Sequence, residues 1–490
     1  MNDTAAAPRQ HYNITFIVLA AGAMSYALLQ SLVVPALPEI QEALHTSESS
    51  VAWVLTAYLL SASIGTPILG RLGDMYGKER VLMWVLLMLS VGTLVSALAN
   101  SMGLLIAGRV IQGAGGGIFP LAFGIIRDEF PRDKVAGGIG LMSSLLGVGG
   151  GAGVVLAGVI LTHSDYHWLF WIPLVVTIAA TIATHLFVPE SPIRTPGKIN
   201  WLGALLMSVG LSIVLLAVSQ TTSWGWGSAK TLILIAVGSL ILVAWVFSEL
   251  RAPEPLVDMR MMRIRGVWTT NLVALLLGAG MYSSFVLLPQ FVQEPKSTGY
   301  GLGTSVLTSG LFLLPSTVAM VIVGQFAGRL ERVFGSRQSL IFGSAFSLIS
   351  FVLLTIVRSE PWEIYLASAF LGLGIGLAFA AMANLIVDNV RQDQTGVATG
   401  MNTVTRTLGG ALGGQIAATF LAGDLGPTLR PTNHAFTLAF GMCAIALALG
   451  LIAAFLVPTR SADRERRRQE AHTEGGAFEP YTPLVDVDAA

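Results

Sequence analysis

The chain has 490 residues, of which 53% are hydrophobic and only 11% are charged. Soluble domains contain about 25% charged residues, so this composition excludes an ordinary soluble protein and indicates an integral membrane protein. The formal net charge is zero, and in the absence of a large basic domain nucleic acid is not expected as a partner. Cys443 is the only cysteine, which excludes an intramolecular disulfide and a multi-cysteine metal site.

Long apolar stretches follow one another along most of the chain. A helix that crosses a bilayer needs about 20 mainly apolar residues, and we therefore predict an all-α integral membrane protein with fourteen transmembrane helices. The predicted helices are 14–37, 51–70, 81–99, 103–126, 136–161, 168–188, 201–220, 231–248, 267–292, 304–325, 339–357, 362–387, 397–421 and 435–457.

The positions of lysine and arginine predict the orientation, because basic residues concentrate in cytoplasmic loops. With the N-terminus inside, most basic residues fall on the inner side, and Arg109 and Arg406 fall inside helices. The basic residues of the predicted outer loops are Lys230, Lys296, Arg358 and Arg430. Residues 1–13 lack a small-residue cleavage site before the apolar stretch, so we expect a retained first helix. Both termini are predicted to be cytoplasmic.

An internal duplication relates the two ends of the chain. Gly70-Arg71-Leu72 recurs as Gly328-Arg329-Leu330, and Asp128 recurs as Asp388, with offsets of 258 and 260 residues. The paired positions indicate two six-helix halves that run parallel, with helices 7 and 8 as an inserted hairpin, and such an arrangement places a binding site between the halves. The predicted parts are an N-terminal tail 1–13, a first half 14–190, the hairpin with its linkers 191–266, a second half 267–458 and a disordered cytoplasmic tail 459–490.

A glycine-rich, charged stretch joins the second and third predicted helices. Its sequence fits the pattern G-x-L-x-D-x-x-G-[RK]-[RK] at Gly70, Leu72, Asp74, Gly77 and Lys78, with Glu79 departing from it. The stretch resembles the loop between helices 2 and 3 of the major facilitator superfamily. The resemblance implies a cytoplasmic gate formed by Gly70, Asp74, Gly77 and Arg80.

Arg109 is a charged residue inside the fourth predicted helix. A charge within a spanning helix usually faces a cavity or a partner, and Gln112 follows on the same helix face; the alternative is a side chain that snorkels to the outer interface. The segment resembles the superfamily motif R-x-x-Q-G-x-G, whose arginine is associated with proton-coupled movement. We expect Gln30 at a similar depth, so that Arg109, Gln112 and Gln30 would form a coupling and cavity network.

The first predicted helix departs from the drug exporters of this superfamily. They have an aspartate where this chain has Leu29, and no Asp or Glu lies in the middle of a predicted helix. Because arginine does not deprotonate in proteins, proton coupling is implied by the resemblance without an obvious carboxylate to carry it. The fifth helix is similar to the antiporter signature at Gly149, Gly153 and Gly158, and its glycines are typical of close helix packing.

Five side chains are candidates for lining a central cavity between the halves. An apolar pocket with a few polar groups suits lipophilic ligands, although each of these side chains taken alone is more often ordinary packing. The candidates are Tyr26, Tyr282, Gln290, Phe379 and Asn384. The residue pattern indicates no metal site, no cofactor and no hydrolytic nucleophile, so we do not expect an enzyme.

The resemblance as a whole points to the fourteen-helix drug:proton antiporter branch of the superfamily. It implies a secondary active exporter of hydrophobic or amphipathic small molecules in a bacterial-type plasma (inner) membrane, with protons as the coupling ion. Two alternatives stay open: a carrier of a polar metabolite that is uncoupled or differently coupled, and a membrane sensor that binds a ligand without moving it. Substrate identity, stoichiometry and oligomeric state are not indicated by the sequence.

Overall fold

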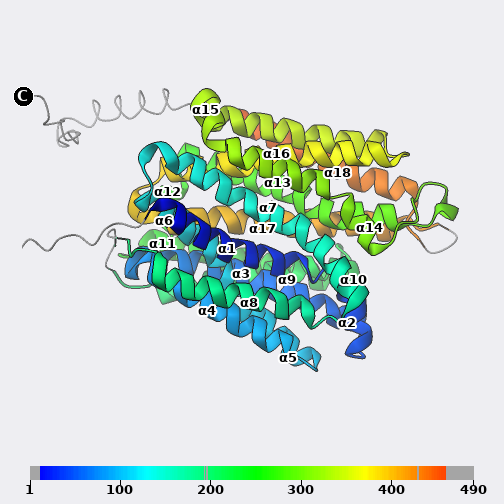
Figure 1. The fold of residues 1–490 in the computed structure, drawn as a ribbon, viewed down its shortest axis with the longest axis horizontal. Helices are drawn as coiled ribbons and strands as arrows, with labels where there is room; N and C mark the ends of the chain where they lie inside the picture. The colour runs from blue at the N-terminus through cyan, green and yellow to red at the C-terminus, as the bar shows by residue number, and fades with distance from the viewer. Residues whose placement is uncertain (1–10, 192–193, 195–196, 427–429, 459–490) are drawn as a thin grey trace, which may run out of the picture.

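The computed structural model describes residues 11–458 apart from 192–193, 195–196 and 427–429. The predicted tail 459–490 and most of the predicted tail 1–13 therefore lie outside the described residues. The described part is helical (Figure 1), and its β-type pairing is an isolated bridge between Leu425 and Pro431. The prediction of an all-helical fold is confirmed for this part of the chain.

The helices follow the predicted order. Up to residue 187 they are α1 (Tyr12–Ser31), α2 (Leu37–Ala43), α3 (Glu48–Tyr76), α4 (Lys78–Ala97), α5 (Met102–Gln112), η1 (Gly113–Gly117), α6 (Ile118–Glu129), α7 (Arg132–His163) and α8 (Trp168–Phe187). They continue with α9 (Trp201–Ser219), α10 (Thr221–Trp224), α11 (Ala229–Arg251), α12 (Met259–Met262), α13 (Arg265–Gln293), η2 (Lys296–Thr298), α14 (Val306–Leu311), α15 (Leu314–Ile356), α16 (Pro361–Asn389), η3 (Gln392–Gln394), α17 (Thr395–Gly423) and α18 (Asn433–Phe455).

Twelve helices of the described residues are long and apolar enough to cross a membrane, compared with the fourteen predicted. One candidate span, Leu307–Ile356, contains two of the predicted helices, which meet in α15 at Gly335, where φ is 78° and ψ is 160°. The other difference is α17, which is not among the twelve; Arg406, Gln415 and Asn402, together with many glycines and threonines, lower its mean hydropathy.

Most helices before residue 190 lie together in the lower part of Figure 1, and most of those after residue 265 lie in the upper part. The most extensive contacts between these groups are those of α7 with α15 and of α17 with α3, and α7 also lies against α16 and α6 against α17. The pair α9 and α11 lies between the groups in sequence, and α9 contacts both α3 and α17.

Glycines at the helix crossings allow the backbones to approach closely. A Cβ atom at Gly149 of α7 would overlap Ala27 of α1, and one at Gly409 of α17 would overlap the Leu275 carbonyl of α13. At the first of these two crossings, between α1 and α7, the Ser31 hydroxyl donates to the Gly149 carbonyl at 2.8 Å. The glycine run of α7 thus serves helix packing, as small residues do in membrane bundles.

The turn after α3 is shorter than the sequence suggests. Gly70 and Asp74 belong to the helix, which continues to Tyr76, and Gly77 alone makes the turn with φ 109°. Glycine adopts this backbone conformation without strain. Asp74 is therefore held on a rigid helix and not on a loop.

Candidate functional site

Arg109 of α5 is fully buried and joins three helices. Its Nε donates to the Val54 carbonyl of α3 at 3.0 Å, and its Nη1 donates to the Leu29 carbonyl of α1 at 3.0 Å. Nη1 also donates to Gln112 Oε1 at 2.7 Å, and the guanidinium carbon lies 4.0 Å from the Tyr58 ring centroid. Since backbone carbonyls and an aromatic face compensate a buried cation, Arg109 faces partners inside the bundle and does not snorkel.

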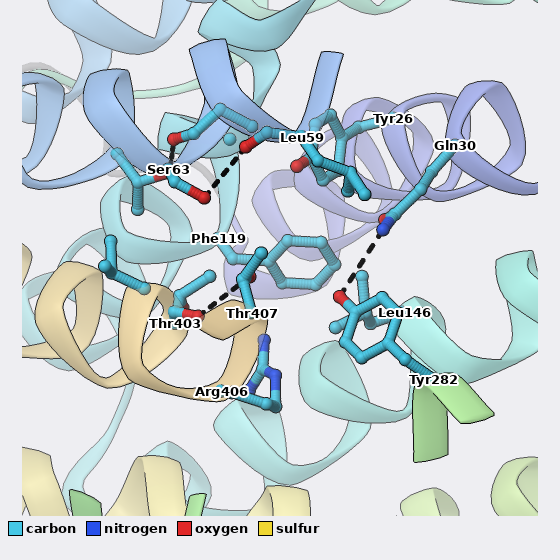
Figure 2. Close-up of a pocket in the computed structure, with 14 residues that line it drawn as sticks. Tyr26, Gln30, Leu59, Ser63, Phe119, Leu146, Tyr282, Thr403, Arg406 and Thr407 are labelled. Carbon is cyan, nitrogen blue, oxygen red and sulfur yellow. Dashed lines mark hydrogen bonds between the residues drawn. The ribbon is translucent and has the colours of Figure 1, made fainter. Parts of the chain in front are cut away.

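The predicted network around Arg109 is realised in part. Gln112 belongs to it and extends it through a bond from Nε2 to Thr93 Oγ1 at 3.1 Å. Gln30 points elsewhere: its Nε2 donates to the Tyr282 hydroxyl at 3.4 Å, which links α1 to α13 (Figure 2). The α1 group that meets Arg109 is the main-chain carbonyl of Leu29.

Two small cavities lie at the centre of the bundle. Tyr26, Gln30 and Tyr282 line the first, Phe379 lines the second, and Arg406 lines both. Their volumes are about 20 Å³ and about 10 Å³, which is room for roughly one water molecule each. Ligand pockets occupy about 300–1,000 Å³, so the two groups of helices must separate before a drug-sized molecule can enter.

Two of the five predicted cavity residues lie outside the linings of these cavities. Gln290 of α13 is exposed. Asn384 of α16 is buried, but its Nδ2 donates to the Ala136 carbonyl of α7 at 3.3 Å and to Glu331 Oε2 at 3.4 Å. Asn384 therefore connects α16 with α7 and α15, and of the five candidates Tyr26, Tyr282 and Phe379 line the cavities.

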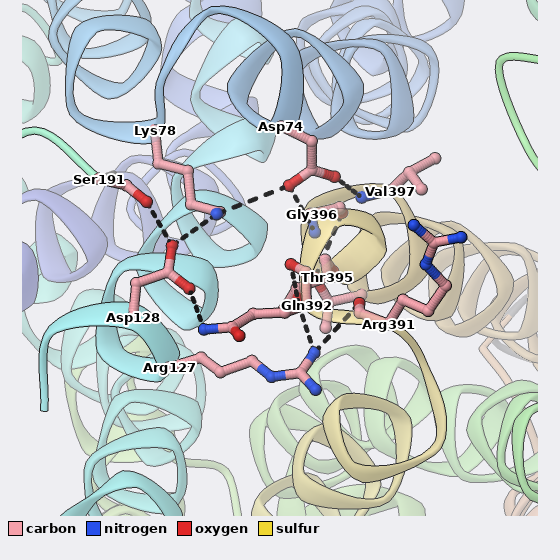
Figure 3. A network of polar contacts seen from close by, with 11 residues as sticks. Asp74, Lys78, Arg127, Asp128, Ser191, Arg391, Gln392, Thr395, Gly396 and Val397 are labelled. Atoms are coloured by element: carbon pink, nitrogen blue, oxygen red, sulfur yellow. Dashed lines mark hydrogen bonds and ion pairs between the residues drawn. The ribbon is translucent and has the colours of Figure 1, made fainter. Parts of the chain in front are cut away.

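Asp74 joins the two groups of helices at one end of the bundle (Figure 3). Its Oδ1 accepts from the Gly396 amide at 3.3 Å, and its Oδ2 accepts from the Val397 amide at 3.2 Å. These amides belong to the first turn of α17, so a carboxylate from α3 caps a helix more than 300 residues later in the chain. Such a carboxylate satisfies unpaired amides and lies at the positive end of the helix dipole.

Arg127 at the end of α6 holds the neighbouring helix end. Its Nη2 donates to the Val390 carbonyl at 3.0 Å, and its Nη1 donates to the Arg391 carbonyl at 3.2 Å and to Thr395 Oγ1 at 2.6 Å. Val390 is the C-cap of α16, where cations interact favourably with the free carbonyls. Asp74 and Arg127 thus hold the two ends of the α16–α17 connection.

A buried ion pair between Lys78 and Asp128 lies next to Asp74 and Arg127. Lys78 Nζ lies 2.6 Å from Asp128 Oδ2 and 4.0 Å from Asp74 Oδ1. Asp128 also accepts from Ser191 Oγ at 2.5 Å and from Gln392 Nε2 at 3.0 Å. We call Asp74, Lys78, Arg127 and Asp128 the gate cluster.

Two of the four predicted gate residues contact the opposite group of helices. Besides Asp74, Gly70 lies against Gly396, since a Cβ atom at Gly70 would be 2.5 Å from the Gly396 carbonyl oxygen. Gly77 instead forms the turn between α3 and α4. Arg80 is largely exposed, and its Nε lies 4.0 Å from Glu190 Oε2 of its own group.

The match to known families agrees with this arrangement. Residues 19–414 and, in a second match, 302–485 fit the Major Facilitator Superfamily. The chain belongs to this superfamily. Its members are transporters and not enzymes, and the protein is accordingly a multi-pass membrane transporter of this superfamily.

Several relatives are named as resistance or export proteins. The chain is 27% identical to the tetracenomycin C resistance and export protein of Streptomyces glaucescens, over 79% of this chain and 71% of that protein. It is 26% identical to multidrug resistance protein 3 of Bacillus subtilis, over 81% and 77%, and 30% identical to the lincomycin resistance protein LmrB of Listeria innocua, over 65% and 67%.

A solved structure shares the fold. The human organic anion transporter MFSD10 (TETRAN) superposes with a TM-score of 0.65 at 16% identity, covering 92% of this chain and all of that one. At this identity the likeness concerns the fold.

Four charged residues of the site were not singled out from the sequence: Arg127, Lys78, Asp128 and Arg406. Arg127 was visible only as one of many basic residues at the inner ends of helices, and its partners are main-chain carbonyls that no motif marks. Lys78 and Asp128 had stronger signals: Lys78 matches the loop motif, and Asp128 has a counterpart in the second half. Arg406 was visible as a charge inside a spanning helix, the same signal that singled out Arg109.

Proposed function

We propose that this protein is a secondary active exporter that moves hydrophobic or amphipathic small molecules out of the cell by alternating access. The observation that carries the proposal is a nearly filled central cavity, lined by both groups of helices, beside an end of the bundle that the gate cluster holds closed. The relatives named for resistance and export support this direction of transport. In the proposal the gate cluster faces the cytoplasm, as do both termini, and the membrane is the bacterial plasma (inner) membrane.

The proposal includes fourteen membrane crossings. A continuous helix of the 43 residues of α15 would be about 65 Å long at 1.5 Å per residue, twice the roughly 30 Å of a bilayer core. The break at Gly335 allows two crossings instead. α17 would cross as well, because it packs against α3 and α13 and its polar Asn402 donates to Asn271 of α13 at 2.9 Å inside the bundle. α9 and α11 would then be a hairpin inserted between two six-helix halves, 14–190 and 267–458.

Protons are the proposed coupling ion, with Arg109 as the organising residue. Its guanidinium stays charged and therefore does not carry the proton. It fixes α1, α3 and α5 relative to one another through the Leu29 and Val54 carbonyls, and a coupled step has to change these contacts. A second candidate is a carrier without ion coupling, which is favoured by the Leu29 carbonyl in place of a carboxylate beside Arg109.

Proteoliposomes with an acidic lumen and inside-out protein would test the coupling. Substrate entering the lumen by antiport releases protons, so a panel of amphipathic cations, neutral compounds and anions should collapse the gradient for the transported members. Arg109→Ala should abolish both the collapse and coupled uptake, and Arg109→Lys should restore at most part of them because lysine lacks the planar fork. Arg332→Ala, at an exposed arginine, controls for reconstitution.

The outcomes separate the candidates. Labelled substrate that crosses without any change in the pH gradient would favour the uncoupled carrier. If no compound of the panel crosses, although binding in the same preparation is measurable, the export proposal is contradicted and a ligand-binding sensor becomes the better reading.

A further inference from the structure

Arg406 is a cation at the centre of the bundle that the proposed mechanism does not use. It lies on α17 and lines both central cavities, with 8% of its surface exposed. Figure 2 shows its guanidinium on the cavity side of α17, facing the region between Phe119 and Tyr282. Its Nε is buried and has no hydrogen-bond partner among the described residues.

Two other buried arginines, Arg109 and Arg358, are compensated mainly by the main chain, although each of them, like Arg406, has one guanidinium nitrogen without a hydrogen-bond partner among the described residues. Arg109 donates to two backbone carbonyls, and Arg358 donates to the carbonyls of Leu354, Thr355 and Asn433. Arg406 instead has its guanidinium carbon 4.4 Å from the Phe379 ring centroid and interacts with the Tyr282 side chain. It contacts none of the main-chain carbonyls that hold Arg109 and Arg358. A charge that is costly to bury is usually paired or faces a functional cavity, so Arg406 is placed to receive a partner that comes from outside the protein.

The surroundings of Arg406 indicate the chemistry of that partner. Among the residues that line the two cavities, all of them in the described part of the chain, Arg406 is the charged one, and neither lining contains a carboxylate. Phe119 and Phe379 offer aromatic faces, and Gln30, Tyr282 and Thr403 offer hydrogen bonds. A guanidinium binds carboxylates and similar oxyanions through two parallel hydrogen bonds.

We propose that Arg406 binds an anionic oxygen of the substrate and that the transporter prefers amphipathic organic anions over cations of the same size and shape. This inference rests on the proposed function, whose central cavity it uses. The aromatic faces would hold the apolar body of the ligand while the guanidinium neutralises its charge. A cationic ligand would meet an unneutralised positive charge in a medium of low dielectric constant, where like charges repel strongly.

Binding of three matched probes would test the preference without requiring transport. Pyrenebutyrate, its neutral methyl ester and the corresponding pyrenebutyl-trimethylammonium share one aromatic body and differ in charge. Binding is measured by fluorescence in nanodiscs of zwitterionic lipid, with empty nanodiscs subtracted. Hydrogen bonds to a charged group contribute about 1.5–3 kcal/mol, so the carboxylate should bind about 10- to 100-fold more tightly than the ester, and the cation most weakly.

Variants at position 406 connect this preference to the arginine. Arg406→Gln should reduce the carboxylate-to-ester ratio to about 1–3, and Arg406→Lys should retain part of it, because lysine keeps the charge but not the fork. Arg332→Gln, which removes the charge of an exposed arginine outside both linings, should leave the ratio unchanged. If Arg406→Gln does not fold, as judged by size-exclusion chromatography, the carboxylate-to-ester ratio of Arg406→Lys is compared with that of the wild type. A lower ratio in Arg406→Lys supports the inference.

Two results would overturn the inference. One is that the wild type binds the cation most tightly. The other is that Arg406→Gln, or Arg406→Lys where Arg406→Gln does not fold, keeps the carboxylate preference unchanged. The proposed export function fails separately. A protein that binds the carboxylate through Arg406 but moves none of the three probes in proteoliposomes would contradict export and leave the anion site in place. A protein that exports the cation alone would support export and contradict the anion site.

Discussion

The gate-side ends of the two helix groups meet at two interfaces that the internal duplication makes equivalent. At the α3–α17 interface Gly70 lies against Gly396, and at the α7–α15 interface Gly328 lies against Gly137. A Cβ atom at Gly70 would be 2.5 Å from the Gly396 carbonyl oxygen, and one at Gly328 would be 2.8 Å from the Gly137 Cα. Backbones therefore touch in both places, at positions that the duplication relates.

The polar residues of the two interfaces differ sharply. The position equivalent to Asp74 is Arg332, which is exposed and donates to the Gly328 carbonyl of its own helix at 3.3 Å. The position equivalent to Arg127 is Val387, a buried apolar residue. The α7–α15 interface therefore lacks the two charged side chains that hold the ends of α16 and α17 at its counterpart.

This difference suggests that the two interfaces have different tasks in alternating access. Opening the α3–α17 interface separates Asp74 and Arg127 from the helix termini that they bind. This separation costs free energy, so the contacts stabilise the closed state. The α7–α15 interface consists mainly of small residues in contact, such as Gly140 against Ala327 and Gly324 against Ser144, and such surfaces can slide with little loss of polar bonding. We therefore expect the first to act as the latch and the second as the pivot.

The largest expected effect is that of Asp74→Asn. The substitution removes the negative charge from the α17 N-terminus, where a capping carboxylate contributes about 1–2 kcal/mol, and a loss of this size shifts a two-state equilibrium by about 5- to 30-fold. In a Cys443→Ser background, Thr399→Cys reports access to the cavity from the gate side. Its labelling by a maleimide should accelerate by this factor in the Asp74→Asn protein, and transport should fall about tenfold.

The equivalent substitution in the second half provides the control for this comparison. Arg332→Gln changes a charge at the related position, where the side chain is exposed and donates to a carbonyl of its own helix. Labelling and transport should therefore stay within about twofold of wild type, as is usual for surface changes. Unchanged transport in Asp74→Asn at equal expression would show that the gate cluster is not a latch.

A smaller effect is expected from Gly70→Ala and Gly328→Ala. Each adds a methyl group whose carbon would lie within 3.0 Å of the opposing backbone, so the halves must move apart. Because the α3–α17 interface is held by charges, Gly70→Ala should accelerate the labelling of Thr399→Cys about threefold, whereas the freer α7–α15 interface should absorb Gly328→Ala with less change. Gly414→Ala, where a Cβ would meet nothing within 4 Å, is the control, and equal effects at 70 and 328 would contradict the division into latch and pivot.

Much of this arrangement could be predicted from the sequence, because hydropathy and repeated landmarks report on whole helices. The apolar stretches anticipated the helix order, and the motif around Gly70 and Asp74 pointed to the residues that contact α17. Side-chain direction was less accessible. Gln30 and Leu29 are neighbours on α1, but the Gln30 side chain leaves the helix toward Tyr282 while the Leu29 carbonyl meets Arg109.

The partners of the gate cluster could not be found from the sequence for a physical reason. Asp74 and Arg127 bind amides and carbonyls of the main chain, which nearly every residue possesses, so the identity of Val397 or Val390 carries no signal of the contact. Gln290 illustrates a different error. Its polar side chain led to the prediction that it lines the cavity, but the rotation of α13 leaves it exposed.

The smallest expected effect is that of Asn384→Ala, at the polar link of the α7–α15 interface. The substitution removes the hydrogen bond of 3.3 Å that crosses to the Ala136 carbonyl of α7, and also the bond of 3.4 Å to Glu331 Oε2 within the second half. A neutral hydrogen bond such as the crossing one contributes about 0.5–1.5 kcal/mol. If this interface is a pivot, the bond persists or re-forms as the halves rotate, and its loss affects both end states alike. Transport should then stay within about twofold of wild type, while thermal unfolding in detergent shows a modest loss of stability. A tenfold fall in transport, comparable with that of Asp74→Asn, would instead place a second latch at α7–α15 and make the two interfaces equivalent in function as well as in sequence.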